Sequence, residues 1–392
     1  MSKRVGVEVS IACADAVGLC DVDVVAAYPI TPQTHIVEHL SELVAEGHLD
    51  AEFVPVESEH SAMSACIGSA AAGARTFTST SSQGYALMSE ICYIASSLRL
   101  PMVMAVANRA ISAPISIWND HADLMFARDV GWIQLIGEYG QEVVDLIPIA
   151  FRIGEDKRVL LPVQVNLDGF TLSHVIEPII MPEKAEIQKF LPPYKPQLRL
   201  DPENPVTMGP VGMPEVYTEA RKAQDEALNN SKAVIQEVFD EFGKQFGRQY
   251  KLVETYKTED AETIIFSMGS ISQTAMSAVD HMRSQGKKVG VVRLRVFRPF
   301  PAKELFDAIK GAKNLVILDR VTAFNGGEIS APVALEIKSV LFDRKHHPKV
   351  GNFLVGLGGR DVTVQNFEEM VEKVAAAKDG ELGPYQFINV RE

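Results

Sequence analysis

The sequence of 392 residues lacks the features that mark membrane, secreted or nucleic-acid-binding proteins. No stretch approaches the roughly 18 uncharged apolar residues of a membrane span, and the N-terminus lacks the apolar core of a signal peptide. Its 38 lysines and arginines are outnumbered by 51 aspartates and glutamates, which gives a net charge of −13 without basic stripes. We therefore expect a cytoplasmic protein with no membrane and no nucleic acid among its partners.

Cysteine is also scarce, and none of the four has the Cys-x-x-Cys spacing of a metal or redox motif: Cys13, Cys20, Cys66 and Cys92. Three of them lie in small-residue or apolar helical patterns, so we interpret them as core thiols. The chain is therefore expected to bind no iron–sulfur cluster itself. Among the scattered histidines, His35 and His39 have helical spacing but no evident third ligand, and we expect no metal site.

Apolar strand patterns alternate with helical patterns along most of the chain. Strands are predicted near 22–27, 53–56, 75–80, 100–107 and 159–167. This alternation predicts an α/β fold with a parallel sheet covered on both faces, whose loops after the carboxyl ends of the strands carry the site.

A proline-rich, weakly periodic stretch from about 178 to 214 and a charged helix from about 214 to 246 separate this series from a second one. A chain of this length is expected to have two or three domains. We place the boundary near residue 257, between a domain of residues 1–257 and a smaller α/β domain of residues 258–392.

Glu59 begins a run of residues with almost no bulk that extends to residue 74. The run predicts a tightly packed, buried helix with the acid in its first turn. A carboxylate at a helix entrance is usually only a favourable partner of the helix dipole. Here it follows the apolar stretch 53–56, which indicates a buried strand that leads into a cleft. Glu59 is therefore a candidate for chemistry.

Arg109 ends another apolar strand, where a guanidinium can form a two-pronged contact with a carboxylate. The competing interpretation is an internal salt bridge with Glu57 or Asp120. Thr31, held between two prolines, could present its hydroxyl to the same anion, or it could only satisfy its own turn. Neither a phosphate-binding glycine loop nor a Gly-x-Ser-x-Gly nucleophile turn is present.

In their order and spacing, seven segments together resemble the α subunit of pyruvate:ferredoxin oxidoreductase, in the 2-oxoacid:ferredoxin oxidoreductase family. The segments are residues 28–32, 57–59, 81–84, 107–110, 117–123, 168–170 and 356–362. The resemblance covers the whole chain. It implies oxidative decarboxylation of a 2-oxoacid with thiamine diphosphate and coenzyme A, and transfer of the electrons to ferredoxin. It also implies a domain for the pyrimidine half of thiamine, followed by a transketolase C-terminal-like domain.

The resemblance assigns roles to individual residues. Glu59 matches the glutamate that hydrogen-bonds the aminopyrimidine ring, and burial and the helix entrance would oppose each other in setting its proton affinity. Thr31 and Arg109 match the positions that hold the substrate carboxylate. The pocket wall is assigned to Tyr28, Pro29 and Gln83. We place the loop of Asn119 and Asp120 beside the substrate.

Thiamine enzymes usually hold the diphosphate through magnesium, with a Gly-Asp-Gly segment and an asparagine further along the chain. No such segment is present in this sequence. The resemblance therefore implies that a partner β subunit supplies the diphosphate and magnesium half of the site. It further implies γ and δ (ferredoxin-like) subunits, iron–sulfur clusters on partner chains and ferredoxin as electron acceptor.

The position occupied by Thr31 favours pyruvate as substrate, because a second carboxylate would require another cation nearby. Oxalate, 2-oxobutyrate and branched oxoacids remain as alternative substrates. A transketolase-like enzyme without ferredoxin and a non-catalytic scaffold subunit are further alternatives. The presence of Glu59, Arg109 and Thr31 together argues against a scaffold.

Overall fold

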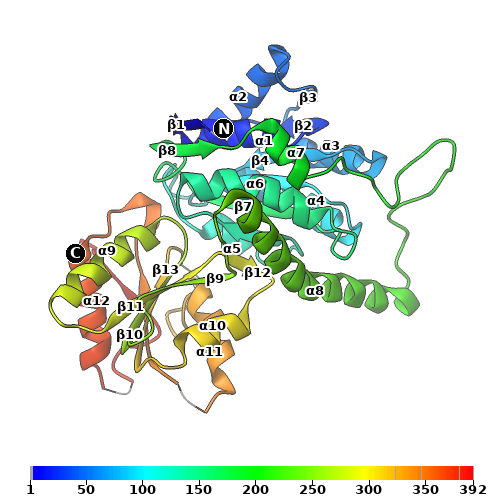
Figure 1. Cartoon of the computed structure of the whole chain (residues 1–392). Coiled ribbons are helices and arrows are strands. Elements are labelled where there is room, and N and C mark those ends of the chain that lie inside the picture. Colours follow the sequence, from blue (N-terminus) through cyan, green and yellow to red (C-terminus); the bar gives the residue numbers. More distant parts are fainter. Residues whose placement is uncertain (1–2, 323, 346, 379, 392) are drawn as a thin grey trace.

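The computed structural model describes residues 3–322, 324–345, 347–378 and 380–391. These residues form two large sheets, each packed between helices, and one small two-stranded sheet. Figure 1 shows the two large sheets in neighbouring halves of the molecule, with the long helix α8 (Pro214–Phe246) running from one toward the solvent. The predicted α/β class is confirmed.

The first sheet has seven strands in the order β12-β6-β7-β5-β4-β2-β3. All neighbours are parallel except β12, which runs antiparallel to β6. The strands are β2 (Val24–Ala27), β3 (Glu52–Pro55), β4 (Thr76–Thr80), β5 (Val103–Asn108), β6 (Ile133–Ile136), β7 (Val163–Asp168) and β12 (Val296–Arg298). Because the parallel strands point the same way, their carboxyl ends lie at one edge.

Successive side chains of these strands point to opposite faces, and each face has its own core. In β5, Val103 and Ala105 belong to one core, whereas Met104 and Val106 belong to the other. Helices α1, α2 and α6 cover the first face, and α3 and α4 cover the second. The helices are α1 (Val9–Leu19), α2 (Thr34–Ala45), α3 (Glu59–Ala72), α4 (Ser82–Ser97), α5 (Ala122–Phe126) and α6 (Gly140–Gly154).

Helix α3 is the predicted helix of small residues. The side chain of Ser58 accepts a hydrogen bond from the Ser61 N–H and caps its start, and Gly73 ends it with φ 100°. A left-handed residue at this position is usually glycine. The expectation of a buried helix is wrong for one face, because Ser64 and Gly68 are exposed. Small side chains therefore line a surface as well as a core.

The second sheet has the order β15-β14-β13-β10-β11-β9. Helices α9 and α12 cover one face, and α10 and α11 cover the other. The strands are β9 (Val253–Tyr256), β10 (Thr263–Ser267), β11 (Val289–Leu294), β13 (Asn314–Asp319), β14 (Lys349–Leu354) and β15 (Gln386–Phe387). The helices are α9 (Ile271–Ser284), α10 (Ala302–Ile309), α11 (Pro332–Phe342), the short η1 (Leu357–Gly359) and α12 (Val364–Ala376).

The two halves exchange strands. Strand β9 precedes the predicted boundary at residue 257 but pairs with β11 in the second sheet, whereas β12 follows that boundary and pairs with β6 in the first. The division near residue 257 stays a prediction. In the described part of the chain, no helix is both long and apolar enough to cross a membrane.

The stretch expected to be irregular contains two regular elements. Strand β8 (Ile176–Met181) pairs antiparallel with β1 (Lys3–Glu8), and α7 (Lys184–Phe190) follows it. Only residues 191–213 form an irregular segment, which Figure 1 shows looping away from the body before α8. The C-terminal half of α8 is buried along one face, where Phe239 and Phe242 join the main core.

Candidate active site

Four segments predicted to carry the site follow neighbouring parallel strands. Residues 28–32 follow β2, Glu59 follows β3 after a short turn, residues 81–84 follow β4, and Arg109 follows β5. Since these four strands are hydrogen-bonded neighbours, the segments meet at the carboxyl edge of the first sheet. The prediction that residues 81–84 form a loop is wrong from Ser82 onward, because α4 already begins there.

Glu59 is the first residue of α3 and is only 6% exposed. A Cβ atom built on Gly84, in the first turn of α4, would lie 2.5 Å from Glu59 Oε1 and 2.7 Å from Thr80 Oγ1. Only glycine therefore leaves room for the carboxylate at this point. Within the described residues, the Glu59 carboxylate has no hydrogen-bond partner. A buried acid in that state is available to a ligand.

Arg109 connects the other predicted residues. Its Nη1 donates to the main-chain oxygen of Thr31 at 2.6 Å, and its Nη2 donates to Gln83 Oε1 at 2.7 Å. The buried Nε has no partner in the described structure. Burial lowers the pKa of Arg109, and the charge of Asp123 opposes that shift. The alternative salt bridge with Glu57 or Asp120 does not form.

Thr31 and Tyr28 lie at the exposed mouth of this edge, together with Pro29. Thr31 contributes its main-chain oxygen to Arg109, while its hydroxyl has no hydrogen-bond partner among the described residues. The Tyr28 carbonyl accepts a hydrogen bond from Gln33 Nε2 at 2.9 Å, and that amide also donates to the Ser79 carbonyl at 3.0 Å. Gln33 thereby holds the segment after β2 against β4.

Asp123, at the start of α5, organises the site but was not among the predicted residues. Its carboxylate accepts hydrogen bonds from the main-chain N–H groups of Ser82, Arg109 and Leu124 and from Asn108 Nδ2, at 2.8 to 3.0 Å. It therefore fixes the start of α4 relative to the end of β5. Burial raises the pKa of Asp123 to about 6, although these hydrogen bonds oppose the shift.

A chain of buried polar side chains supports Asp123 from behind. Asn108 Nδ2 also donates to Asn166 Oδ1 at 3.2 Å, as does Gln164 Nε2, and the Tyr85 hydroxyl donates to Gln164 Oε1. The sequence carried a signal for this chain. Polar residues alternate with apolar ones along β7, and a strand places alternate side chains on the same face.

Asp168, which ends β7, was predicted to lie near the site, and it joins the two halves of the molecule. Its carboxylate accepts hydrogen bonds from His121 Nε2 at 2.9 Å, the Ser270 N–H at 2.8 Å and Arg320 Nη1 at 3.0 Å. Burial alone would raise the pKa of Asp168, but the charge of Arg320 and the hydrogen bond from His121 prevail and hold it below its ordinary value.

The loop of Asn119 and Asp120 also contacts the second half. The Asn119 carbonyl accepts a hydrogen bond from the Gly359 N–H at 2.9 Å, and Asp120 Oδ1 accepts one from the Ala122 N–H. Both polar atoms of the Asn119 side chain are buried without a partner in the described structure. A position of this loop beside a substrate stays a prediction.

Unpartnered buried polar atoms gather at the edge described above. Buried polar groups are normally hydrogen-bonded, so such a group of exceptions indicates a place where a ligand completes the bonding. In addition to Asn119 and Arg109 Nε, those at this edge are Gln33 Oε1, Ser79 Oγ and Thr80 Oγ1, while other such atoms of the described residues, among them Gln134 Oε1 and Arg152 Nε, lie elsewhere.

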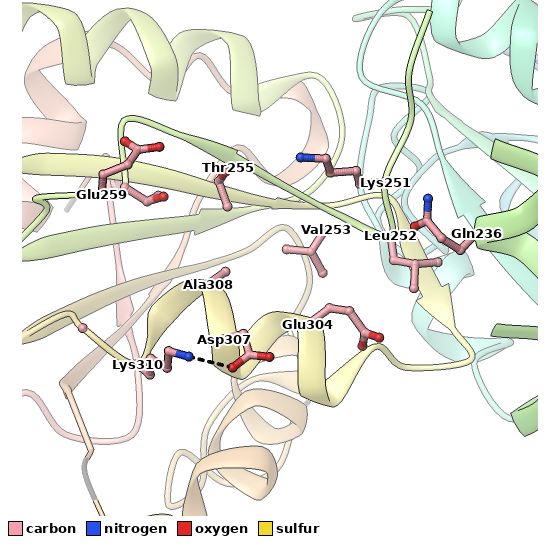
Figure 2. Close-up of a pocket in the computed structure, with 12 residues that line it drawn as sticks. Gln236, Lys251, Leu252, Val253, Thr255, Glu259, Glu304, Asp307, Ala308 and Lys310 are labelled. Carbon is pink, nitrogen blue, oxygen red and sulfur yellow. Dashed lines mark hydrogen bonds and ion pairs between the residues drawn. The ribbon is translucent and has the colours of Figure 1, made fainter. Parts of the chain in front are cut away.

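Of two cavities in the described structure, one adjoins the carboxyl edge of the first sheet and the other lies away from it. One of about 720 Å³ is lined by Ala110, the residue after Arg109, by Asp120, and by Val321, Thr322 and Phe324 of the second half. Another of about 550 Å³ lies between β9, α8 and α10 (Figure 2), with Lys251 and an ion-paired Lys310 on its walls. No predicted site residue lines the second cavity.

Comparisons with known proteins agree with this geometry. The family described as pyruvate flavodoxin/ferredoxin oxidoreductase, thiamine diphosphate-binding, matches residues 15–240, and the pyruvate:ferredoxin oxidoreductase core domain II matches residues 261–367. In three dimensions the chain is similar to a 2-oxoglutarate:ferredoxin oxidoreductase from Magnetococcus marinus, with a TM-score of 0.70 and 18% identity over 95% of this chain and 65% of that longer chain. A split-gene transketolase matches with a TM-score of 0.55 and 13% identity, over 94% of this chain and 98% of that one. Both likenesses show the fold, including its predicted transketolase-like character.

Curated relatives match over nearly their whole length. The pyruvate synthase subunit PorA of Methanocaldococcus jannaschii is 49% identical over 94% of each chain, and that of Thermotoga maritima is 47% identical, also over 94% of each. The ketoisovalerate oxidoreductase subunit VorA of Pyrococcus horikoshii is 43% identical over 90% of this chain and 88% of the relative. This chain therefore belongs to the thiamine diphosphate-binding pyruvate flavodoxin/ferredoxin oxidoreductase family.

Proposed function

We propose that this chain is the catalytic α subunit of a pyruvate:ferredoxin oxidoreductase, which converts pyruvate and coenzyme A to acetyl-CoA and carbon dioxide and passes the electrons to ferredoxin. The observation that carries the proposal is the unpartnered carboxylate of Glu59, held against Gly84 at the edge where Arg109 also lies. Family membership supports the class of reaction.

The residues at this edge fit the pyrimidine half of thiamine diphosphate. Glu59 offers a hydrogen-bond acceptor, and the unpartnered Gln33 Oε1 and Thr80 Oγ1 offer further polar contacts to an aminopyrimidine. When bound, thiamine diphosphate supplies a carbon centre that accepts the electrons released by decarboxylation. The part of Glu59 is to hold and exchange a proton at its carboxylate oxygen, facing the ring.

Arg109 is proposed to hold the pyruvate carboxylate. Its Nη atoms are fixed by the Thr31 carbonyl and by Gln83, so the guanidinium is oriented before a substrate arrives. The free Nε–H and the remaining Nη hydrogens are then available as a planar fork for a carboxylate. The hydroxyl of Thr31 and the side chains of Tyr28 and Pro29 complete the wall on the exposed side. Fixing the oxoacid in this way lowers the entropic cost of reaction.

The diphosphate, magnesium and iron–sulfur clusters are proposed to lie on partner chains. The sequence has no Gly-Asp-Gly segment, and its four cysteines are buried and free. The surface beside Glu59 supports a partner there, because α3 presents Ser64 and Gly68 and α4 exposes Leu87 (51%) and Ile94 (41%). We assign this surface to a β subunit that carries the diphosphate and magnesium. Ferredoxin-like γ and δ subunits would complete the electron path. The cytoplasmic location stays a prediction.

Glu59→Gln in the assembled complex tests the proposal. Glutamine keeps the size of the side chain but cannot take up a proton, so pyruvate-dependent reduction of ferredoxin or viologen should fall by about 100-fold or more. The matched control is Glu57→Gln, two residues earlier, where the carboxylate is exposed and hydrogen-bonded to Ser61. Near-normal activity of Glu59→Gln would exclude the assignment.

Substrate choice is tested with the same preparation. The uncharged Thr31 favours pyruvate over an oxoacid with a second carboxylate, whereas the VorA relative makes 2-ketoisovalerate the alternative to measure. We expect the highest kcat/KM with pyruvate in a panel that also includes 2-oxobutyrate, oxalate and 2-oxoglutarate. A preference for 2-ketoisovalerate would keep the chemistry and correct the substrate.

A further inference from the structure

Three potential metal ligands from different parts of the chain meet beside the site. Glu8 ends β1, His35 is the second residue of α2, and His174 lies in the turn between β7 and β8. One nitrogen of each histidine and one oxygen of Glu8 lie within 4.8 Å of one another. Within the described residues, no other group of three such side chains comes together in this way.

The backbone around this group is firmly tied. The Val9 N–H donates to the Val175 carbonyl at 3.1 Å, and the Ser10 N–H donates to the Ser173 carbonyl at 2.9 Å. The corner of β1 and α1 is thereby joined to the turn that carries His174. The His174 ring is further placed by a hydrogen bond between its Nδ1 and Ser173 Oγ at 2.8 Å.

Two tilted ring contacts further restrict the same ring. The centroid of Phe170 lies 4.2 Å from that of His174, and the His35 ring lies 4.6 Å from it. Metal-bound histidines usually have one ring nitrogen held by a second hydrogen bond, which leaves the other for the ion. His174 meets this condition through Ser173.

We propose that Glu8, His35 and His174 form a binding site for a divalent transition-metal ion, with zinc as the favoured ion. Two imidazoles and one carboxylate are a ligand set that zinc accepts, with further positions left for water. Ligands of a tetrahedral zinc lie about 3.4 Å from one another, given bonds of about 2.1 Å. His35 Nδ1 and Glu8 Oε1, at 2.6 Å, would therefore move apart by about 0.8 Å when zinc binds. Any pair of ligand atoms near the upper separation of 4.8 Å would move closer together.

His39 shows why neighbouring histidines do not form such a site. It lies one turn after His35 on α2, but its Nε2 contacts Asp15 at 2.9 Å and its Nδ1 contacts Glu42 at 3.2 Å. Both nitrogens are used, and they point to different carboxylates. The expectation of no metal site considered only residues close in sequence, whereas the third ligand lies 139 positions beyond His35.

The test measures zinc binding by the purified, metal-stripped full chain with isothermal titration calorimetry. The wild type should take up one Zn²⁺ per chain, with a rise in Tm. His35→Ala and His174→Ala should each weaken binding by about 100-fold or more, since even outer contacts to a metal ligand contribute about 10- to 100-fold. Because all four thiols are buried, they should not compete for the ion.

His39→Ala is the matched control and should bind zinc as the wild type does. Co²⁺ provides a second probe, and its visible spectrum should show nitrogen and oxygen ligands without a thiolate band. If His174→Ala does not fold, His35→Ala decides, because the His35 side chain is 40% exposed and tolerates removal. No saturable binding by the wild type, or equal binding by wild type and His35→Ala, would overturn the proposal. Catalytic activity does not enter the measurement, so the test is independent of the proposed function.

Discussion

Two buried carboxylates at the carboxyl edge of the first sheet are used in opposite ways. Asp168 accepts hydrogen bonds from His121, Ser270 and Arg320, whereas Glu59 has no partner in the described structure. Asp168 ends β7 and Glu59 follows the partly exposed edge strand β3, and both acids are almost fully buried. Burial alone therefore does not separate a structural acid from a functional one. What separates the two acids is the number of hydrogen-bond donors that the protein itself supplies to each carboxylate.

The largest expected effect is the loss of unfolding free energy in Asp168→Asn. This change leaves the charge of Arg320 without its carboxylate, and breaking a buried ion pair costs about 3 to 5 kcal/mol of unfolding free energy. Because the pKa of Asp168 is lowered, its contribution is present above the ordinary pKa of an aspartate and is lost as the pH falls below it. Urea unfolding at neutral pH measures the loss. Glu59→Gln, the matched change, should leave stability within about 1 kcal/mol, and an equal loss in both variants would remove the distinction.

Asp123 is intermediate between Asp168 and Glu59, because its carboxylate accepts hydrogen bonds only from uncharged donors. Burial raises its pKa to about 6 from 3.8, so its contribution to stability is complete below the lower value and is lost as the pH rises through the higher one. The shift corresponds to about 3 kcal/mol. Asp123→Asn stays neutral throughout, so the stability of the wild type relative to this variant should fall by that amount between about pH 4 and pH 7. Urea unfolding across this range measures it, and a constant difference would contradict the prediction.

Gly84→Ala tests whether the space around Glu59 matters while Glu59 itself is left unmutated. The added methyl would lie 2.5 Å from Glu59 Oε1 and must displace the carboxylate, so kcat should fall by about 100-fold, or roughly 2.7 kcal/mol. In the free energy of unfolding, the preference of alanine over glycine in a helix, about 1 kcal/mol, should offset part of the cost of these close contacts, which is about 1 to 3 kcal/mol. Gly18→Ala in α1 is the control, since its nearest neighbour lies 3.5 Å away. Unchanged kcat in Gly84→Ala would show that Glu59 does not need its present position.

Arg109→Lys should have the smallest effect. Lysine keeps the positive charge but cannot contact Gln83, the Thr31 carbonyl and a substrate carboxylate together as a planar guanidinium can. The KM for pyruvate should rise by about tenfold, with less change in kcat. Steady-state kinetics of the complex measure both values. A KM equal to that of the wild type would place the substrate carboxylate elsewhere.

The sequence predicted the elements at the site well because local patterns determine them. The apolar run of β5, the small residues of α3 and the prolines around Thr31 are visible in short windows. Asp123 was missed because its role depends on donors from two distant segments, at Ser82 and at Asn108 and Arg109. Spacing along a chain does not show which donors a fold will bring to one oxygen.

The outward face of α3 was misread for a related reason. Alanine, serine and glycine fit a tight core and a flat surface equally well, so a run of small residues does not reveal which face is covered. The same limit applied to Asp168, whose partner Arg320 lies in the other half of the chain. Contacts between distant segments are decided by topology, and a single sequence shows them only indirectly.

The exchange of strands has a consequence for protein engineering. Strand β12 completes the edge of the first sheet from beyond residue 257, so a fragment ending there would leave the backbone groups of β6 unpaired on that side. Open strand edges are templates for aggregation. Chimeras that graft one half of this chain onto a relative of different substrate preference should therefore carry β12 together with β6. The segments to exchange in such chimeras are therefore those that belong to the same sheet, even where they are distant in sequence.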